Sequence, residues 1–274
     1  MHSSSSLVSQ RSLSISLSVL VSFFSKDEWD NSGWMRIRSR ILNDLNTVVC
    51  EGQFSGYSAL FILAGYPQGL RLLTDDAGLR DKITPEGLNA VLAQGTSKGC
   101  SALFCLVSFP EGRQLLLDDK GLRDKITVVG LHSVIAEGED KGKSVLYFLA
   151  GSYEGERLLQ DDEVLRGKIT AEGLNAIIPD GEDQGYSALF CLASYPEGRQ
   201  LLVDDKGLRD KIMDEGLNAV IPEGEDKGKS VLLHLADTSV GRQLIVDDKG
   251  LRDKITDEGL NAVIAEGELS LIHI

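Results

Sequence analysis

Aromatic residues are scarce in this sequence, since Phe, Trp and Tyr make up only 6% of a chain that is 42% hydrophobic. A core of this composition consists mainly of Leu, Ile, Val and Ala. No Cys/His pair recurs with the spacing of a metal site, and no glycine-rich phosphate loop follows a strand pattern. These absences argue against an enzyme, and the sequence predicts no catalytic residue, no metal site and no cofactor.

Cysteine is also rare, and the few cysteines do not form a disulfide framework. They are Cys50, Cys100, Cys105 and Cys191. Residues 105 and 191 are 86 apart, two periods of the repeat described below, which places them two layers apart in the predicted stack. This separation exceeds the limit of about 7 Å between Cα atoms that a disulfide allows. Unpaired thiols are typical of a reducing compartment, so we expect a cytoplasmic protein.

Basic residues are outnumbered, with 28 Lys and Arg against 42 Asp and Glu and a net charge of −14. Nucleic acids attract clusters of Lys and Arg, so no nucleic-acid partner is expected. A basic peptide or a basic protein face fits the sign of the charge. Long apolar runs are missing too, because the longest stretch is too short to span a bilayer, and no membrane partner is expected.

Residues 1–34 differ from the rest of the chain in composition. Ser3–Ser6 is a serine run, and serine alternates with apolar residues between Ser12 and Phe24. We expect a disordered Ser-rich leader. No Ala-x-Ala-like cleavage site follows it, although secretion by this leader stays open as an alternative.

Internal repetition is the most informative feature of the sequence. Gly-Leu-Arg-Asp-Lys-Ile occurs at Gly78–Ile83, Gly121–Ile126, Gly207–Ile212 and Gly250–Ile255, with a divergent copy at Val164–Ile169. The copies begin at residues 78, 121, 164, 207 and 250, so the period is 43 throughout. A fixed period of this length predicts stacked layers, each of which contacts its neighbours.

Each period carries the signals of helices. Thr84-Pro-Glu-Gly predicts a helix that runs to Gln94 and ends at a glycine. A second, apolar helix is expected to be the buried central one. It is predicted to start at a series of cap residues, Ser97, Asp140, Asp183 and Asp226.

A third helix is predicted from Pro110 to Ile126, with a bend at Gly121. A lone first helix is predicted at Ile41–Glu51. No stretch of the repeats alternates with period two over the length of a strand, so the sequence predicts an all-α fold.

Three helices in about 42 residues, with Pro110-Glu-Gly-Arg-Gln-Leu-Leu after the helix Ala102-Leu-Phe-Cys-Leu, resemble the armadillo/HEAT class of α-solenoids. The resemblance covers residues 35–268 and implies a right-handed α-solenoid of about five three-helix repeats. One departure is a longer stretch between the hexapeptide and the Ala-Leu-Phe helix than armadillo repeats have. By this resemblance we expect a protein–protein interaction scaffold that binds an extended or basic partner along one face.

Two alternatives to a scaffold stay open. The chain is a structural spacer or assembly element without a specific ligand, or it is a secreted effector of a host-associated microbe. The first alternative needs no feature beyond the repeats. The second rests on the unusual leader and on the close similarity of the repeat copies.

An asparagine series is the first candidate partner-binding set. Asparagine offers two donors and an acceptor to an extended backbone, and armadillo proteins that bind peptides use a recurring asparagine on another helix. The alternative is that each asparagine fixes a neighbouring loop. The series comprises Asn46, Asn89, Asn175, Asn218 and Asn261, with His132 in the vacant place.

A second candidate set follows a recurring glycine and varies between aromatic and cationic residues within a constant frame. This variation suggests an outward position that sets specificity, and drift at an exposed site is the alternative. The set comprises Tyr57, Cys100, Lys143, Tyr186 and Lys229.

Acidic loops recur as well, at Glu137–Asp140, Asp180–Asp183 and Glu223–Asp226. They lack the alternating oxygen ligands of a calcium loop, so a solvated, helix-capping surface is expected.

The last residues, 269–274, match no repeat position and are expected to be an artefactual tail on an incomplete array. Leu260, Val263 and Ile264 would then lack the next layer. We expect self-association through this uncapped C-terminal end.

Overall fold

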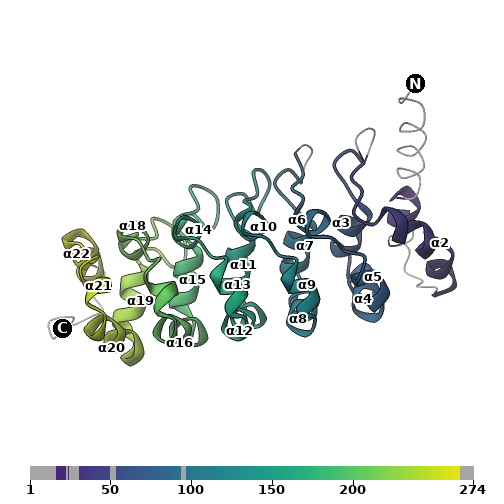
Figure 1. The fold of residues 1–274 in the computed structure, drawn as a ribbon. Helices are drawn as coiled ribbons and strands as arrows, with labels where there is room; N and C mark the ends of the chain where they lie inside the picture. Colours follow the sequence, from purple (N-terminus) through teal and green to yellow (C-terminus); the bar gives the residue numbers. More distant parts are fainter. Residues whose placement is uncertain (1–16, 23, 25–30, 50–53, 94–96, 266–274) are drawn as a thin grey trace, which may run out of the picture. The chain divides into compact units, whose positions relative to one another are not determined.

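The structure is a computed structural model that describes residues 17–22, 24, 31–49, 54–93 and 97–265. These residues form helices joined by loops and contain no strand, so the all-α prediction is confirmed (Figure 1). One isolated bridge pairs Val220 with Ser230. Contacts divide the chain into two compact units, residues 1–138 and 139–274. Cys50, Glu51, Gly95 and the predicted tail 269–274 lie outside the described residues.

Unit 1 begins with a helical segment at residues 17–22 and the helix α2 (Asn31–Asp44). Two successive sets of four short helices follow. They are α3 (Ala59–Ala64), α4 (Pro67–Asp75), α5 (Ala77–Arg80) and α6 (Pro85–Asn89), then α7 (Ala102–Ser108), α8 (Pro110–Asp118), α9 (Lys120–Asp124) and α10 (Val128–His132).

Unit 2 repeats this set three times. The first set is α11 (Val145–Ala150), α12 (Tyr153–Asp161), α13 (Glu163–Gly167) and α14 (Ala171–Asn175). The second is α15 (Ala188–Ser194), α16 (Pro196–Asp204), α17 (Lys206–Arg209) and α18 (Asp214–Asn218). The third is α19 (Val231–Asp237), α20 (Ser239–Asp247), α21 (Lys249–Arg252) and α22 (Asp257–Ala265).

Equivalent helices of successive sets pack on one another within each unit. In unit 1, α3 contacts α7 and α4 contacts α8. In unit 2, α15 contacts both α11 and α19, and α16 contacts both α12 and α20. Each 43-residue period is therefore one layer, as the period predicted.

The predicted third helix is in fact two helices, so a layer has four helices rather than three. The chain leaves the helical region at Asp119 (φ −114°, ψ 93°), between α8 and α9. The Asp119 carboxylate then accepts a hydrogen bond from Leu122 N at 2.9 Å and caps α9. The predicted bend at Gly121 is therefore wrong, because the break occurs two residues earlier.

The predicted first helix of the layer is shorter than expected. It ends at Asn89, because Ala90 takes an extended conformation (ψ 122°). The following chain brings Leu92 into the core, where Leu92 N donates to Cys100 O at 2.8 Å. The apolar spacing that suggested a continued helix therefore reflects one buried residue in an extended loop. The lone helix predicted at Ile41–Glu51 is likewise wrong, since α2 begins at Asn31 and ends at Asp44.

The central helix begins four residues later than predicted. Its cap in the second layer is Ser101, whose Oγ accepts from Phe104 N at 3.0 Å, rather than Ser97. Gly99 lies between the two serines with a φ of +94°, which favours glycine and interrupts any helix started at Ser97. Ser58, Ser144, Ser187 and Ser230 cap the other central helices.

Part of the predicted leader is ordered. Leu17 and Leu20 in the first helical segment are fully buried, and Phe24 stacks on Tyr66 with ring centroids 5.5 Å apart. Trp34 of α2 is also buried. Apolar residues on the N-terminal side of the boundary predicted at residue 34 therefore pack on the first layer.

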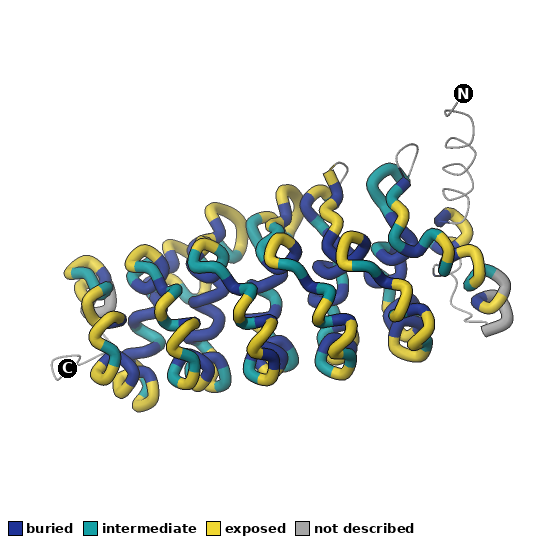
Figure 2. The backbone as a smooth tube through the Cα atoms, in the orientation of Figure 1, coloured by how far each residue is buried: buried dark blue, intermediate teal, exposed yellow. Residues whose placement is uncertain are grey.

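The core follows the central helices, as expected from their apolar sequences. Figure 2 shows buried residues concentrated on these helices, with exposed residues on the outer helices and loops. Most Leu and Ala residues of the central helices are almost completely buried. So are the Leu of each hexapeptide copy and the Ile of every copy except the last, exemplified by Leu208 and Ile212.

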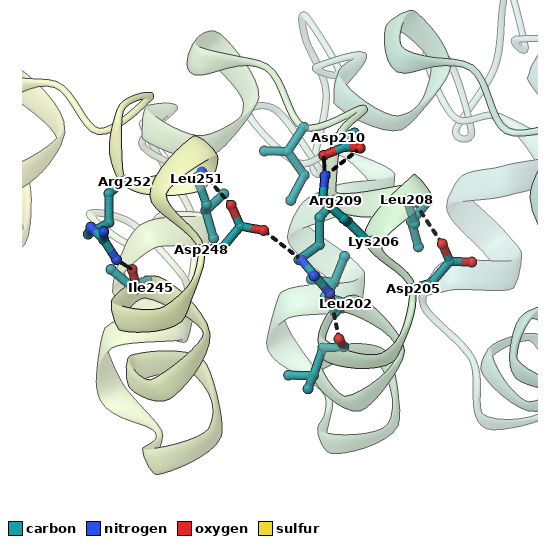
Figure 3. Close-up of polar contacts among 12 residues, drawn as sticks. Leu202, Asp205, Lys206, Leu208, Arg209, Asp210, Ile245, Asp248, Leu251 and Arg252 are labelled. Atoms are coloured by element: carbon teal, nitrogen blue, oxygen red, sulfur yellow. Dashed lines mark hydrogen bonds and ion pairs between the residues drawn. The ribbon is translucent and has the colours of Figure 1, made fainter.

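The arginine of the hexapeptide joins two layers. Arg209 Nη1 donates to Leu202 O at 2.8 Å, at the C-terminal end of α16 in its own layer. Arg209 Nε donates to Asp248 Oδ2 at 2.9 Å in the next layer (Figure 3). Asp248 Oδ1 in turn accepts from Leu251 N and caps α21. One guanidinium thus satisfies the end of one helix and orients the cap of another.

The same arrangement, which we call the Arg–Asp clasp, occurs in both units. Its pairs are Arg38–Asp76 and Arg80–Asp119 in unit 1 and Arg166–Asp205 and Arg209–Asp248 in unit 2. The hydrogen bond from Arg209 holds the pKa of Asp248 below its ordinary value, so the carboxylate stays ionised at neutral pH.

We predict that Arg209→Ala lowers the free energy of unfolding by about 2 kcal/mol, because it leaves the Leu202 carbonyl and the Asp248 carboxylate without their charged donor. Urea unfolding followed by circular dichroism measures the change. Lys206→Ala is the matched control, since Lys206 forms only an exposed pair with Asp210 and should cost no more than about 0.5 kcal/mol. Equal losses in the two variants would contradict the structural role of the clasp.

Candidate partner-binding face

Within each unit, the loop before each central helix, together with that helix, forms a face on which members of the second candidate set lie. The recurring serine cap fixes the start of the helix, so the residue just before the cap always has the same place in the layer. This residue is Tyr57, Cys100, Lys143, Tyr186 or Lys229, and all five are half-buried. The prediction of an outward position is therefore met only in part.

In unit 1 this face is aromatic. The ring of Tyr57 packs edge-on against Phe61, with centroids 5.0 Å apart, and its hydroxyl lies 3.5 Å from Ser97 Oγ of the next layer. A groove of about 530 Å³ opens here between α3 and α7, and Cys100 and Phe104 also line it.

In unit 2 the same positions carry ion pairs and charged hydrogen bonds. Lys143 Nζ lies 2.7 Å from Asp183 in the next layer and 3.0 Å from Asp140. Burial lowers the pKa of Lys143, but its hydrogen bonds to these carboxylates outweigh this effect and raise the pKa above its ordinary value.

One layer further on, Tyr186 Oη donates to Asp226 Oδ2 at 2.6 Å, and Lys229 Nζ lies 2.6 Å from Asp226 Oδ1. The ring of Phe190 meets the ring of His234 edge-on at 4.9 Å. His234 Nε2 is buried without a hydrogen-bond partner, and burial lowers the pKa of this imidazole, which favours its neutral form.

At three of the five positions, the residue before the serine cap therefore contacts a residue 40 positions later, in the loop of the next layer. The pairs are Tyr57 with Ser97, Lys143 with Asp183 and Tyr186 with Asp226. The first pair joins two hydroxyl groups, the second joins an ammonium group to a carboxylate, and in the third a hydroxyl donates to a carboxylate. The variation seen in the sequence therefore occurs in pairs that link neighbouring layers.

The asparagine series lies elsewhere, at the ends of the short helices α6, α14 and α18. Asn175 Nδ2 donates to Ala171 O at 2.6 Å and to Lys211 O at 2.8 Å, and Asn175 Oδ1 accepts from Met213 N at 2.9 Å. Both donors and the acceptor are used within the chain. The structure thus shows the alternative role, in which the amide fixes the neighbouring layer.

Three further asparagines make equivalent bonds. Asn46 joins Lys82 O and Thr84 N, Asn89 joins Lys125 O and Thr127 N, and Asn218 joins Lys254 O and Thr256 N. His132 is the last residue of α10, and Asn261 is an exposed residue of α22. The series and the second candidate set do not form one site.

A glycine makes room for each asparagine. A Cβ atom at Gly216 would collide with Asn175 Oδ1, and the same holds for Gly130 with Asn89 and for Gly259 with Asn218. Each Gly-Leu-Asn sequence therefore takes part in two contacts. Its glycine makes room for the asparagine of the preceding layer, and its asparagine binds the backbone of the following layer.

The acidic loops are exposed and contain carboxylates without an ion-pair partner. Glu182 and Glu225 occupy equivalent places one period apart, and Glu139 and Glu223 are also exposed. In contrast, Asp183 and Asp226 of the same loops are engaged by Lys143 and Lys229. Among the described residues, no three His, Cys, Asp or Glu side chains are grouped as metal ligands would be.

Glu156 of α12 is a buried carboxyl group that sequence reasoning did not identify. It is 2% exposed, and its Oε1 has no hydrogen-bond partner. Sister layers carry Arg113, Arg199 and Arg242 at this position, and Arg199 Nη1 donates to Ala193 O at 2.7 Å. Burial, with the nearby Glu197 carboxylate, raises the pKa of Glu156 to about 8. An alignment of the repeats would have revealed this position, because it has a carboxylate where three other layers have a guanidinium.

Comparison of the chain with protein-family models, with curated proteins and with solved structures found no match. No described helix combines the length and apolar character needed to cross a bilayer.

We predict that Asn175→Ala lowers the free energy of unfolding by about 2 kcal/mol, because it leaves the Lys211 carbonyl and the Met213 amide of the next layer unpaired. Urea unfolding measures the loss. Asn261→Ala is the control, since Asn261 is exposed and should change the stability by less than about 0.5 kcal/mol. An unchanged unfolding midpoint for Asn175→Ala would contradict a structural role of the series.

We predict that the stability of unit 2 falls as the pH rises from about 4.5 to about 8 through the titration of Glu156. Because the folded-state pKa lies above the unfolded value, the folded protein holds a proton in this window that the unfolded chain has lost. Urea unfolding as a function of pH should show a slope of the order of 1 kcal/mol per pH unit. This slope should disappear in Glu156→Gln.

Glu156→Arg serves as a second variant, since it restores the residue of the sister layers. It should stabilise the protein throughout this pH range. An identical pH dependence in the wild type and in Glu156→Gln would exclude Glu156 as its source.

Proposed function

We propose that the protein is a non-enzymatic, protein–protein interaction scaffold of the cytoplasm, built as a right-handed α-solenoid of about five 43-residue repeats. It binds an extended segment of a partner along the face formed by the central helices and the loops that precede them. The observation that carries this proposal is a constant structural frame with one varying surface position. Clasps and asparagines recur from layer to layer, whereas the residue before the serine cap is aromatic, thiol or cationic.

Charge supports a basic partner for the acidic loops. Glu182, Glu223 and Glu225 are exposed on unit 2 without an ion-pair partner, and the whole chain carries a net charge of −14. Lys and Arg side chains of a partner would find carboxylates that are not neutralised within the chain. Complementary charge of this kind raises the association rate and fixes the register of an extended segment.

A structural spacer without a specific ligand is the second candidate. It is favoured by the extent to which polar groups are used internally, since the described asparagine amides at Asn89, Asn175 and Asn218 are occupied by neighbouring backbone groups. Layers held together by internal contacts need no ligand. The two proposals differ in whether the varying face binds anything.

We predict that a library of random 15-residue peptides displayed on phage and selected on the full chain enriches basic peptides, with binding that weakens as salt increases. The double variant Glu182→Lys/Glu225→Lys should lose about tenfold in affinity for them. Both side chains are exposed and unpaired, so the change leaves the layer contacts intact.

The matched control is Gln200→Lys/Gln243→Lys, which adds two cations at equivalent positions of the outer helices α16 and α20. It should bind the peptides with nearly wild-type affinity. A selection that enriches no sequence above the unselected library would support the spacer instead.

A further inference from the structure

The aromatic groove of unit 1 is the surface with the most distinctive composition in the described chain. Its lining includes six aromatic residues, Phe54, Tyr57, Phe61, Tyr66, Phe104 and Phe109. The whole chain has only 16 aromatic residues, namely 8 Phe, 6 Tyr and 2 Trp. More than a third of them therefore gather in one groove, and five of the six are half-buried rather than packed in the core. Aromatic side chains held in this way are typical anchor sites of protein interfaces.

The groove is also uncharged. None of the described residues that line it carries a charge, in a chain of which 26% of the residues are charged. Its polar groups are the hydroxyls of Tyr57, Tyr66, Ser97 and Ser108 and the thiols of Cys100 and Cys105. A charged side chain placed here would lose its hydration without gaining a partner, whereas an apolar one would gain from burial.

Unit 2 shows what the same positions do when they are charged. At the positions equivalent to Tyr57 and Ser97 it has Lys143 and Asp183, which form an ion pair of 2.7 Å across the layers. The same backbone arrangement therefore accommodates either the Tyr–Ser pair or the Lys–Asp pair. The aromatic choice in unit 1 leaves a groove of about 530 Å³, within the range of about 300–1,000 Å³ typical of ligand pockets.

The described part of the leader lines one side of the groove and does not occupy it. Val21 lines it, and Phe24 stacks on Tyr66 at 5.5 Å. Leu17 and Leu20 fix this segment on the first layer, since both are fully buried. The open part of the groove lies between α3 and α7.

We propose that this groove binds an extended segment of a partner protein through one uncharged anchor side chain, aromatic or branched aliphatic, with no charged residue next to it. The inference rests on the proposed scaffold function and deepens it, because it specifies the chemistry of the partner at unit 1. An anchor of this kind would stack on the half-buried rings and displace water from an apolar surface.

The test uses a phage library of 15-residue peptides selected on the full chain. Peptides that bind unit 1 should share one uncharged aromatic or branched aliphatic position. The decisive variant is Tyr57→Lys/Ser97→Asp, which transfers the Lys143–Asp183 pair into unit 1 and is compatible with the frame, as the ion pair in unit 2 shows. It should reduce the affinity for these peptides at least tenfold, while its circular dichroism spectrum and urea midpoint stay close to those of the wild type.

The outer-helix variant Gln200→Lys/Gln243→Lys is the control and should leave the affinity unchanged, since neither residue lies on a central helix or on the loop that precedes one. Alkylation of Cys100 by iodoacetamide provides a local readout, because this half-buried thiol lines the groove. Bound peptide should slow its modification at least threefold, as measured by mass spectrometry of the digested protein. Cys105 is a poor reporter, since burial raises the pKa of its thiol to about 12.

Several results would overturn the proposal. Peptides that bind the folded Tyr57→Lys/Ser97→Asp variant equally well, and leave Cys100 alkylation unchanged, would place binding elsewhere while the scaffold function stands. A failure to enrich any peptide would reject both. Protection of Cys100 without peptide would assign the groove to the chain itself. If removal of residues 1–16 abolished the protection of Cys100, the leader would be the occupant. If the protection increased with protein concentration, a second copy of the chain would be the occupant.

Discussion

The Arg–Asp clasp is the contact on which the regularity of this protein depends. One guanidinium holds the last carbonyls of an outer helix and the aspartate that starts a short helix 39 residues later, as between Arg209 and Asp248. The clasp requires the aspartate at a fixed place in the next layer, which it reaches 39 residues after the arginine in three of the four pairs and 38 residues after it in the first. The asparagine contacts impose the same condition from the other side of the layer, where Asn175 reaches Lys211 O and Met213 N. Two independent links between layers therefore recur with the 43-residue period.

This constraint separates residues that maintain the layers from residues that are free to differ. Leu208 and Ile212 of the hexapeptide fill the core, Arg209 forms the clasp, and the backbone carbonyl of Lys211 accepts from an asparagine of the preceding layer. Almost every position of the motif is thus committed to stacking. The loop before the central helix is less committed, since Tyr57 with Ser97 and Lys143 with Asp183 serve the same contact. The side chains can vary there because the contact requires only that the two residues form a hydrogen bond or an ion pair with each other.

The sequence was sufficient to predict helices, layers and the identity of the central helix, since these follow from apolar spacing within a single repeat. It was not sufficient to locate the break at Asp119, because that residue is drawn into its capping role partly by Arg80 of the previous layer. The asparagines were assigned to a partner for the same reason, as their hydrogen-bond partners are backbone groups about 36 residues away. Of the candidate site, the sequence shows which position varies between repeats. Its pairing with the next loop depends on distances between layers that no single repeat contains.

The paired contacts between layers have a consequence for how such a chain lengthens. Within each unit, a junction between layers takes one half of each contact from one repeat and the other half from its neighbour, as Gly216 and Asn175 illustrate. A block of whole repeats copied in tandem therefore creates a junction whose clasp and asparagine already fit, without any new interface to be selected. New counterparts then meet at the loop pair, such as Tyr186 with Asp226, and where the central helices differ, such as Phe190 with His234. Tandem duplication in this architecture thus retains the clasp and the asparagine contact while it changes the side chains around the start of each central helix.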